Sequence, residues 1–536
     1  MKKLFFKRSN STFLFTIVLV CGILVFNPVG NLFAYDVDNE FIPGAFPGKV
    51  KVRTFSIPVN PDKVMVVYPG SSESIAEDLR LKLARKCGHE IPFHNADELS
   101  ESDFHGKHLI VIGNITNNRW ALELYRKRCA FADAYFPGNS GVVIHPITSL
   151  WDPDCYVLVI GVSRDEDIQM GFDTFLSLIE DGARTIESIH HLKTSLNFPK
   201  APEGVKRIFD SVRKDINVNR ISYGLMPDWG LSYYLTGNKK WAEHFRDGMY
   251  FLYERGEKTG KWIPEPWTNV YFLFWKMVLV WDLLDEDPFF TIKDHRIIDE
   301  VLWGYFNFCR GKPIPLLDAD RCLPGEMRQN HSTFMALSLF YAHRYFTGKY
   351  GISGLDDVAE KFRRCFDGQA QSYRPNDDAG GYLNYGVTHT LNYLMAQGDD
   401  SYLENGRLRD AASLTIAALD NRRDPVSLGD VGGYAHRRRD YPRGLEDRFL
   451  SMAAWYYRDS EFQWVYNWST QDRSFRLESL YSGDYTVDIP EKHPETFLGI
   501  HPVILDETSL RWSARRSEKS SFMPLVGRRY IDKMAF

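Results

Sequence analysis

Two patterns of hydrophobic residues divide the chain. Between about residues 45 and 200, short apolar runs at 64–68, 109–113 and 156–161 alternate with segments of helical periodicity such as 79–86. Continuous apolar runs of five or six residues are typical of strands that are buried on both faces of a sheet. The pattern therefore predicts an α/β domain over residues 45–200.

After a linker rich in proline and glycine at 197–204, the apolar positions follow the helical period. Turn-like segments recur at regular intervals, at 233–237, 285–288, 345–348, 395–398 and 456–459. Helical hairpins repeated at such intervals are typical of a solenoid or of a closed α/α toroid. Segment 271–281 is apolar on nearly all sides, which favours an inner ring of helices enclosed by an outer ring. We therefore predict an incomplete α/α toroid over residues 205–465.

The remaining residues, 466–536, return to short strand-like segments and end in an apolar stretch at 530–536. No polar tail closes this segment. We expect it to be the start of an antiparallel β-sandwich that is cut short. The predicted fold is thus multidomain, with an α/β domain, an incomplete toroid and part of a sandwich.

Residues 1–34 have the layout of a secretory signal peptide. Lys2, Lys3, Lys7 and Arg8 precede an apolar run at 13–26, and a short segment then ends at Ala34. The apolar run is shorter than the roughly 20 residues that span a bilayer. A retained signal anchor and a lipoprotein linked at Cys21 are the alternatives. We expect a secreted or periplasmic protein without stable membrane insertion.

Composition narrows the function classes. Hydrophobic residues at 44% and charged residues at 25% are typical of globular proteins and exclude collagen-like, disordered and polytopic membrane chains. A net charge of −5 provides no global positive field for nucleic acid. The seven cysteines are widely spaced and form no C-x-x-C pair, so they predict no zinc site. We expect neither a cofactor nor a catalytic metal.

Polar residues gather in the long loops between the predicted hairpins. These loops carry Glu265 to Asn269, Arg328 to Thr333, Asp377 to His389 and Asp430 to Arg439. The step from Asn330 to Tyr385 is about one repeat, and so is the step from Tyr385 to His436. Equivalent positions of consecutive hairpins are neighbours in a toroid. We therefore expect these residues to meet at the mouth of its central cavity.

One of these motifs resembles a known family. Arg328-Gln-Asn330-His331-Ser-Thr333 opens an apolar helix, and a Gly-Gly-x-x-x-Tyr segment ends at Tyr385. Together with the helical repeats, this resembles the heparinase II/III-type polysaccharide lyases, which have an α/α toroid followed by a β-sandwich. The resemblance covers the helical middle of the chain and the strand-like segment after it. It implies β-elimination in a uronic-acid polysaccharide, with Asn330 neutralising the uronate carboxylate and with His331 and Tyr385 as base and acid.

The chemistry explains these residue types. The C5 proton of a uronic acid is very weakly acidic, so the neighbouring carboxylate charge must be masked before it is removed. The amide of Asn330, the positive end of a helix and Arg328 are suited to this task. A tyrosine serves as acid or base only when nearby cations lower its pKa from about 10. The other residues predicted to bind the anionic polysaccharide are Trp267, Tyr382, His389 and His436.

Other interpretations of the same residues stay open. Asn330, Ser332 and Thr333 are typical helix N-caps, and the triplets at Asn330 and Asn114 are N-glycosylation sequons. A glycoside hydrolase would instead need two carboxylates beside the glycosidic bond. The candidates for that pair are Glu326, Asp377, Asp378 and Asp430. A non-catalytic glycan-binding protein is the third alternative, and no interpretation includes a nucleic-acid partner.

Overall fold

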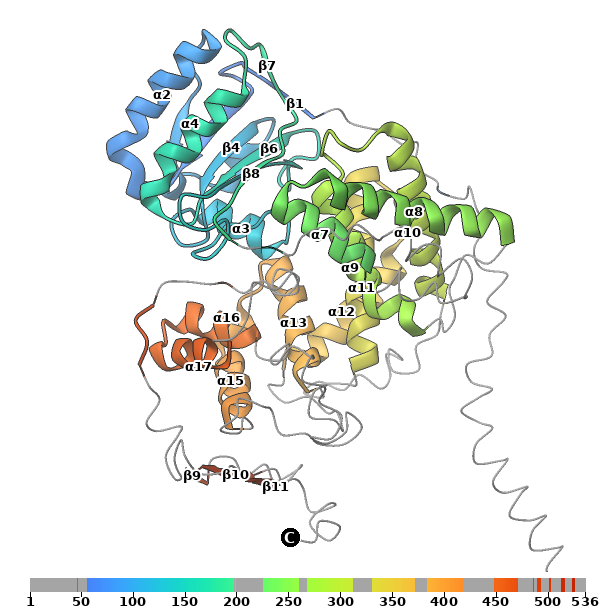
Figure 1. The fold of residues 1–536 in the computed structure, drawn as a ribbon. Helices are drawn as coiled ribbons and strands as arrows, with labels where there is room; N and C mark the ends of the chain where they lie inside the picture. Colours follow the sequence, from blue (N-terminus) through green and yellow to red (C-terminus); the bar gives the residue numbers. More distant parts are fainter. Residues whose placement is uncertain are drawn as a thin grey trace, which may run out of the picture.

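The computed structural model describes Phe46 and residues 55–196, 198, 225–259, 268–311, 330–371, 383–417, 448–470, 485, 489–492, 501–502, 512–515 and 523–525. An α/β domain is followed by a helical domain and by a small sheet (Figure 1). The small sheet is antiparallel, and its strands are β9 (His501–Pro502), β10 (Trp512–Arg515) and β11 (Met523–Leu525). The predicted signal peptide lies outside the described residues.

The α/β domain is built on a six-stranded mixed sheet with the order β3-β2-β4-β6-β5-β8. Its strands are β2 (Val64–Tyr68), β3 (Phe93–Asn95), β4 (His108–Gly113), β5 (Val142–Thr148), β6 (Tyr156–Gly161) and β8 (His191–Lys193). Strands β3, β2, β4 and β6 are parallel, whereas β5 pairs antiparallel with β6 and β8. The three apolar runs that predicted strands are confirmed as β2, β4 and β6. A separate antiparallel pair joins β1 (Ser56–Pro58) to β7 (Thr185–Glu187).

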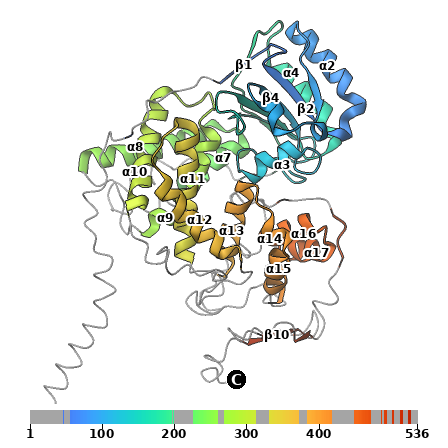
Figure 2. The same ribbon diagram turned by 180° about the vertical axis from the view of Figure 1, so that it is seen from behind.

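Helices cover both faces of this sheet, which explains why its central strands are apolar throughout. Helices α2 (Glu73–Cys87) and α4 (Ile168–Leu178) share one core with Ile110, whereas α3 (Arg119–Arg126) shares the other with Val111. Successive strand residues point to opposite faces, so both positions must be apolar. Figures 1 and 2 show α2 and α4 on the outer side and α3 toward the helical domain.

The described residues between 225 and 470 contain helices and no strand. The helices are α7 (Met226–Thr236), α8 (Lys239–Thr259), α9 (Thr268–Leu284), α10 (Ile292–Gly311), α11 (Asn330–Tyr350), α12 (Asp356–Gln369), α13 (Leu383–Gln397), α14 (Ser401–Glu404), α15 (Arg407–Ala417), α16 (Arg448–Tyr457) and α17 (Ser460–Thr470). The last helix continues past the boundary expected at residue 465.

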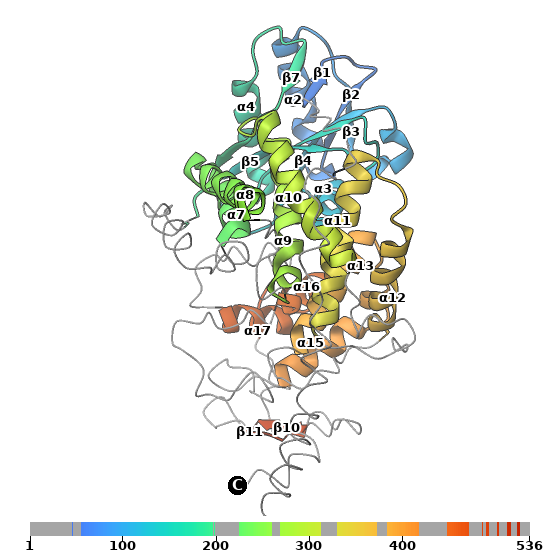
Figure 3. The ribbon, with the colours of Figure 1, turned by 90° about the vertical axis from the view of Figure 1, so that its right-hand side faces the viewer.

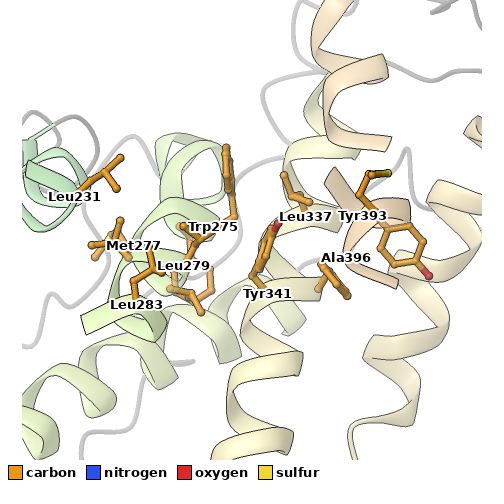
Figure 4. Packing of buried hydrophobic residues seen from close by; sticks show 14 of the residues in the cluster. Leu231, Trp275, Met277, Leu279, Leu283, Leu337, Tyr341, Tyr393 and Ala396 are labelled. Atoms are coloured by element: carbon orange, nitrogen blue, oxygen red, sulfur yellow. The ribbon is translucent and has the colours of Figure 1, made fainter. Parts of the chain in front are cut away.

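Alternate helices of this domain are neighbours. Helix α9 packs between α7 and α11, and α13 packs between α11 and α16. Helices α8, α10 and α12 pack against members of this row, and α7, α9, α11 and α13 are called the inner helices below. Trp275 and Leu279 of α9 lie in the same apolar cluster as Tyr341 of α11 (Figure 4). Within the apolar segment 271–281, the described side chains of residues 274–281 are buried except for the half-buried Lys276, as the sequence predicts.

The four inner helices run in the same direction. In each neighbouring pair, residues later in one helix contact residues later in the other, as expected for parallel helices. The contacting pairs are Gly230–Val280, Tyr233–Asp287, Phe272–His331, Tyr345–Asp285, Phe334–Tyr385 and Phe340–Tyr393. Figure 3 shows α9, α11 and α13 side by side. The amino-terminal ends of α9, α11 and α13 consequently lie at one end of the domain.

The α/β domain packs against the opposite, carboxyl-terminal end of the inner helices (Figure 1). Arg126 pairs with Asp400 beyond α13, and the Arg344 guanidinium of α11 donates to the carbonyl oxygen of Lys127 at 2.5 Å. An apolar cluster that contains Phe131 continues across the same boundary. The amino-terminal ends of the inner helices therefore face away from the α/β domain.

Four of the five predicted turns coincide with helix ends, and one is wrong. Left-handed residues end three helices, namely Gly237 after α7, Gly398 after α13 and Arg458 after α16. The turn predicted at 345–348 is instead helical, because α11 continues through Gly348 to Tyr350. Phe346 packs edge-on against Trp303 at 4.9 Å, which stabilises this extra turn. The left-handed residue that follows is Gly351, at φ 64°.

Candidate functional site

The structure describes part of the predicted site. Asn330 is the first residue of α11, and His331, Tyr385 and His389 have described side chains. The side chain of Asn330 lies outside the described residues. So do Arg328, Trp267, Tyr382, His436 and the carboxylates considered for hydrolysis, which are Glu326, Asp377, Asp378 and Asp430.

His331 and Tyr385 are brought to the same end of the helical domain through Phe334. The Phe272 ring of α9 lies 4.9 Å from the His331 ring and 4.8 Å from the Phe334 ring. Phe334 in turn lies 5.2 Å from the ring of Tyr385 on α13. All four side chains are half-buried. Residues about one repeat apart in the sequence thus share one small aromatic surface at the amino-terminal ends of three inner helices.

His389, one helical turn after Tyr385 on α13, packs against the same cluster. Its ring stacks on that of Tyr385, with centroids 5.8 Å apart and planes 24° apart, so the two side chains share one face of α13. Its Nδ1 lies 2.8 Å from the hydroxyl oxygen of Thr333, and Phe334 packs edge-on against it at 4.3 Å. His389 is only 2% exposed, so it lies inside the helical core rather than on the surface.

Both imidazoles of this site are neutral near neutral pH. Burial lowers the pKa of His389 to about 3, and the positive charge of Lys276 on α9 contributes in the same direction. Burial also lowers the pKa of His331 below its usual value. A neutral imidazole is able to accept a proton, so the half-buried His331 is chemically suited to act as a base. The fully buried His389 is not placed to meet a substrate.

Positive charge at this site comes from two described sources. Lys276 is half-buried on α9 close enough to His389 to affect its pKa. Helices α9, α11 and α13 begin here as well, and the amino-terminal end of a helix carries a partial positive charge. The arrangement favours a bound anion over a cation.

Phe272, Phe334 and Lys276 belong to the site, although no sequence pattern predicts them there. The sequence favours Thr333 as an N-cap, yet Ser332 and Thr333 lie within the first turn of α11. The hydroxyl of Thr333 pairs with His389, which is far away in the sequence. The available signal was the spacing, because Thr333 and His389 are separated by nearly the same interval as Asn330 and Tyr385.

The described residues outside this site give less evidence of a function. Within the described ranges, no cluster of His, Cys, Asp and Glu side chains is arranged to hold a metal ion. The described cysteines are buried and free of disulfides, and they are Cys87, Cys129, Cys155, Cys309 and Cys365. Among the described helices, none combines the length and hydropathy of a bilayer-spanning segment.

Known proteins offer no relative with which this geometry can be compared. The chain matches no protein-family model, no curated protein and no solved structure.

Proposed function

We propose that the chain is a polysaccharide lyase that cleaves an anionic, uronic-acid-containing polysaccharide by β-elimination. The observation that supports this function is that the amino-terminal ends of α11 and α13 lie close together. Helix α11 begins with Asn330 and His331, and its Phe334 ring contacts Tyr385 in the first turns of α13. This elimination needs a group that masks a carboxylate, a base and an acid, and all three types occur on these two helix ends.

The helical domain is proposed to be an incomplete α/α toroid with this site at its mouth. The packing of alternate helices and their common direction support an inner ring of α7, α9, α11 and α13. A site at the amino-terminal ends lies away from the α/β domain, which occupies the other end. The α/β domain then serves as a base for the toroid, and the substrate approaches from the opposite side.

The proposed roles follow from the chemistry of each group. The amide of Asn330, the start of α11 and Arg328 reduce the charge on the uronate carboxylate, which makes the C5 proton more acidic. His331 takes that proton, and the Tyr385 hydroxyl gives a proton to O4 as the C4–O4 bond breaks. A C4=C5 double bond forms, and no water is consumed. The half-buried Phe272 and Phe334 rings offer apolar faces against which a sugar ring can pack.

The test uses the purified full chain with polyuronates and sulfated glycosaminoglycans. We expect ultraviolet absorbance from the unsaturated uronate and fragments whose summed mass equals that of the substrate. Fragments that have gained one water, without the absorbance, would instead support the glycoside hydrolase. Binding without cleavage would support the glycan-binding alternative. A secreted or periplasmic location is part of the proposal, because such polymers are extracellular.

A further inference from the structure

The interior side of the site contains a hydroxyl and an imidazole in contact, and the proposed catalytic roles use neither of them. Thr333 and His389 are 0% and 2% exposed, and their polar atoms lie 2.8 Å apart. Thr333 belongs to the first turn of α11, shortly after Asn330 and His331. His389 belongs to α13, one turn after Tyr385.

We propose that His389 is a positioning residue for Tyr385, held in place by Thr333, and that it does not touch the substrate. This inference rests on the proposed function of the site. The bond between Thr333 and His389 joins the two helix ends that carry the proposed catalytic groups. It therefore fixes the spacing between Asn330 and His331 on one side and Tyr385 on the other.

The packing around His389 determines what it can do. The Tyr385 ring stacks on one face, the Phe334 ring meets it edge-on at 4.3 Å, and the Trp275 ring lies at 6.1 Å. No substrate group reaches a ring enclosed in this way without displacing one of these side chains. Phe334 also contacts Tyr385, so the three rings form one unit in which a shift of His389 moves the tyrosine.

The protonation state supports the same role. The pKa of His389 is lowered to about 3 by burial, so the imidazole stays neutral across the working pH range. A group that does not titrate cannot shape the pH dependence of the reaction. Its contribution is therefore geometric, and misplacement of a reacting group by about 1 Å costs roughly 100-fold in rate.

The test uses pairs of variants that separate the hydrogen bond from the ring. Thr333→Val removes the hydroxyl, and Thr333→Ser keeps it. His389→Phe keeps the ring and loses the polar atom, whereas His389→Asn keeps a polar atom near Nδ1 and loses the ring. Thr390→Val is the matched control, because Thr390 is equally buried on α13 but its shorter hydrogen bond goes to the Gly386 carbonyl oxygen of its own helix at 2.8 Å, with a longer one of 3.5 Å to Gln369 of α12.

We expect Thr333→Val to lower kcat by about 10- to 100-fold with little change in KM. Thr333→Ser should restore most of the rate, and both His389 variants should fall below wild type. The pH profile of kcat should keep its shape in every variant, and Thr390→Val should retain full kcat. A raised KM with unchanged kcat in the His389 variants would show substrate binding and overturn the proposal. Loss of one limb of the pH profile would show acid–base catalysis and overturn it as well.

A second measurement does not depend on activity. Fluorine NMR of 3-fluorotyrosine incorporated at position 385 reports the surroundings of that one ring. Thr333→Val should shift or broaden its resonance, Thr333→Ser should restore it, and Thr390→Val should leave it unchanged. If the wild-type chain cleaves no polyuronate, the proposed function fails while this measurement still tests the positioning. The positioning role would be overturned if Thr333→Val left the resonance unchanged while it lowered the melting temperature as much as Thr390→Val does.

Discussion

The Nδ1 atom of His190 lies 2.6 Å from a carboxylate oxygen of Asp287, and both side chains are almost fully buried. His190 comes from the α/β domain, between β7 and β8, and Asp287 comes from the turn that follows α9. Asp287 also accepts a hydrogen bond from the Tyr233 hydroxyl of α7 at 3.0 Å and one from the Phe289 amide at 2.8 Å. This pair therefore joins the α/β domain to the carboxyl-terminal end of the inner helices.

Disruption of this pair should destabilise the protein strongly. Removal of the imidazole leaves a buried carboxylate oxygen of Asp287 without its hydrogen-bond partner, which costs about 1–3 kcal/mol. We expect this loss in the free energy of unfolding of His190→Ala, measured by urea denaturation. The control is Lys258→Ala, which breaks an exposed ion pair with Glu254 and should cost less than about 0.5 kcal/mol. Equal losses in the two variants would contradict a structural role for the buried pair.

Stability should fall as the solution is acidified. Burial lowers the pKa of His295 to about 4, that of His389 to about 3 and that of His145 well below its usual value. In the unfolded chain each histidine regains a pKa of about 6.5, so the unfolded state gains protons below that pH while the folded state does not. The stability from these groups is complete above pH 6.5 and is lost as the pH falls, by about 2 kcal/mol each for His295 and His389 at pH 5.

One buried carboxyl acts in the opposite sense. Burial raises the pKa of Asp299 to about 6, so the folded state binds a proton more readily than the unfolded chain between about pH 6 and 4. This group adds only about 1.4 kcal/mol of stability at pH 5, which is less than the histidines remove. Urea denaturation at several pH values should therefore show a net decrease below pH 6.5. Constant stability between about pH 7 and 5 would contradict this prediction.

His145→Phe should make the protein more stable and less sensitive to acid. The His145 ring is fully buried, and neither of its nitrogens has a hydrogen-bond partner. It packs edge-on against Tyr234 at 4.7 Å, a contact that a phenyl ring can also make. The substitution removes an unsatisfied polar group, which should stabilise the folded state by about 1–2 kcal/mol at neutral pH. The gain should widen as the pH falls; a gain that narrows would argue against a neutral, buried His145.

The sequon at Asn114 should not be glycosylated in the folded protein. Asn114 is 1% exposed, and its amide nitrogen donates to the carbonyl oxygens of Val162 and Ser163 at 3.0 and 3.2 Å. Its side-chain oxygen accepts a hydrogen bond from the Thr116 amide at 2.8 Å. Mass spectrometry of protein from a glycosylating host should find this site unmodified. Asn114→Ala should cost about 2–3 kcal/mol of stability, because these groups lose their partner.

Tyr385→Phe should separate catalysis from packing. The substitution keeps the ring that stacks on His389 and deletes one hydroxyl. If the hydroxyl transfers a proton, turnover should drop by about 100- to 10,000-fold with substrate binding nearly unchanged. Tyr393→Phe is the control on the same helix, since Tyr393 is buried and stacks on Phe366 at 4.6 Å. Full activity in Tyr385→Phe would remove the proposed catalytic role from this residue.

Several features were determined by the sequence alone, because they depend on residues that are close together in it. The runs that form β2, β4 and β6 are apolar at consecutive positions, which is typical of strands that are buried on both faces of a sheet. The all-round apolar segment 271–281 likewise required burial between other helices. Spacings of about one repeat also brought His331 and Tyr385 to the same end of the helical domain.

Only the tertiary structure decided the remaining features, because they depend on contacts between distant residues. Gly348 stays helical because Phe346 packs on Trp303, which outweighs the local preference of glycine for a turn. His190 and Asp287 lie far apart in the sequence, and no local pattern links them. Similarly, nothing near Thr333 indicates that its hydroxyl pairs with His389 rather than capping a helix. Burial, which comes from the packing of whole elements, then lowers the pKa of His389 and keeps its imidazole neutral.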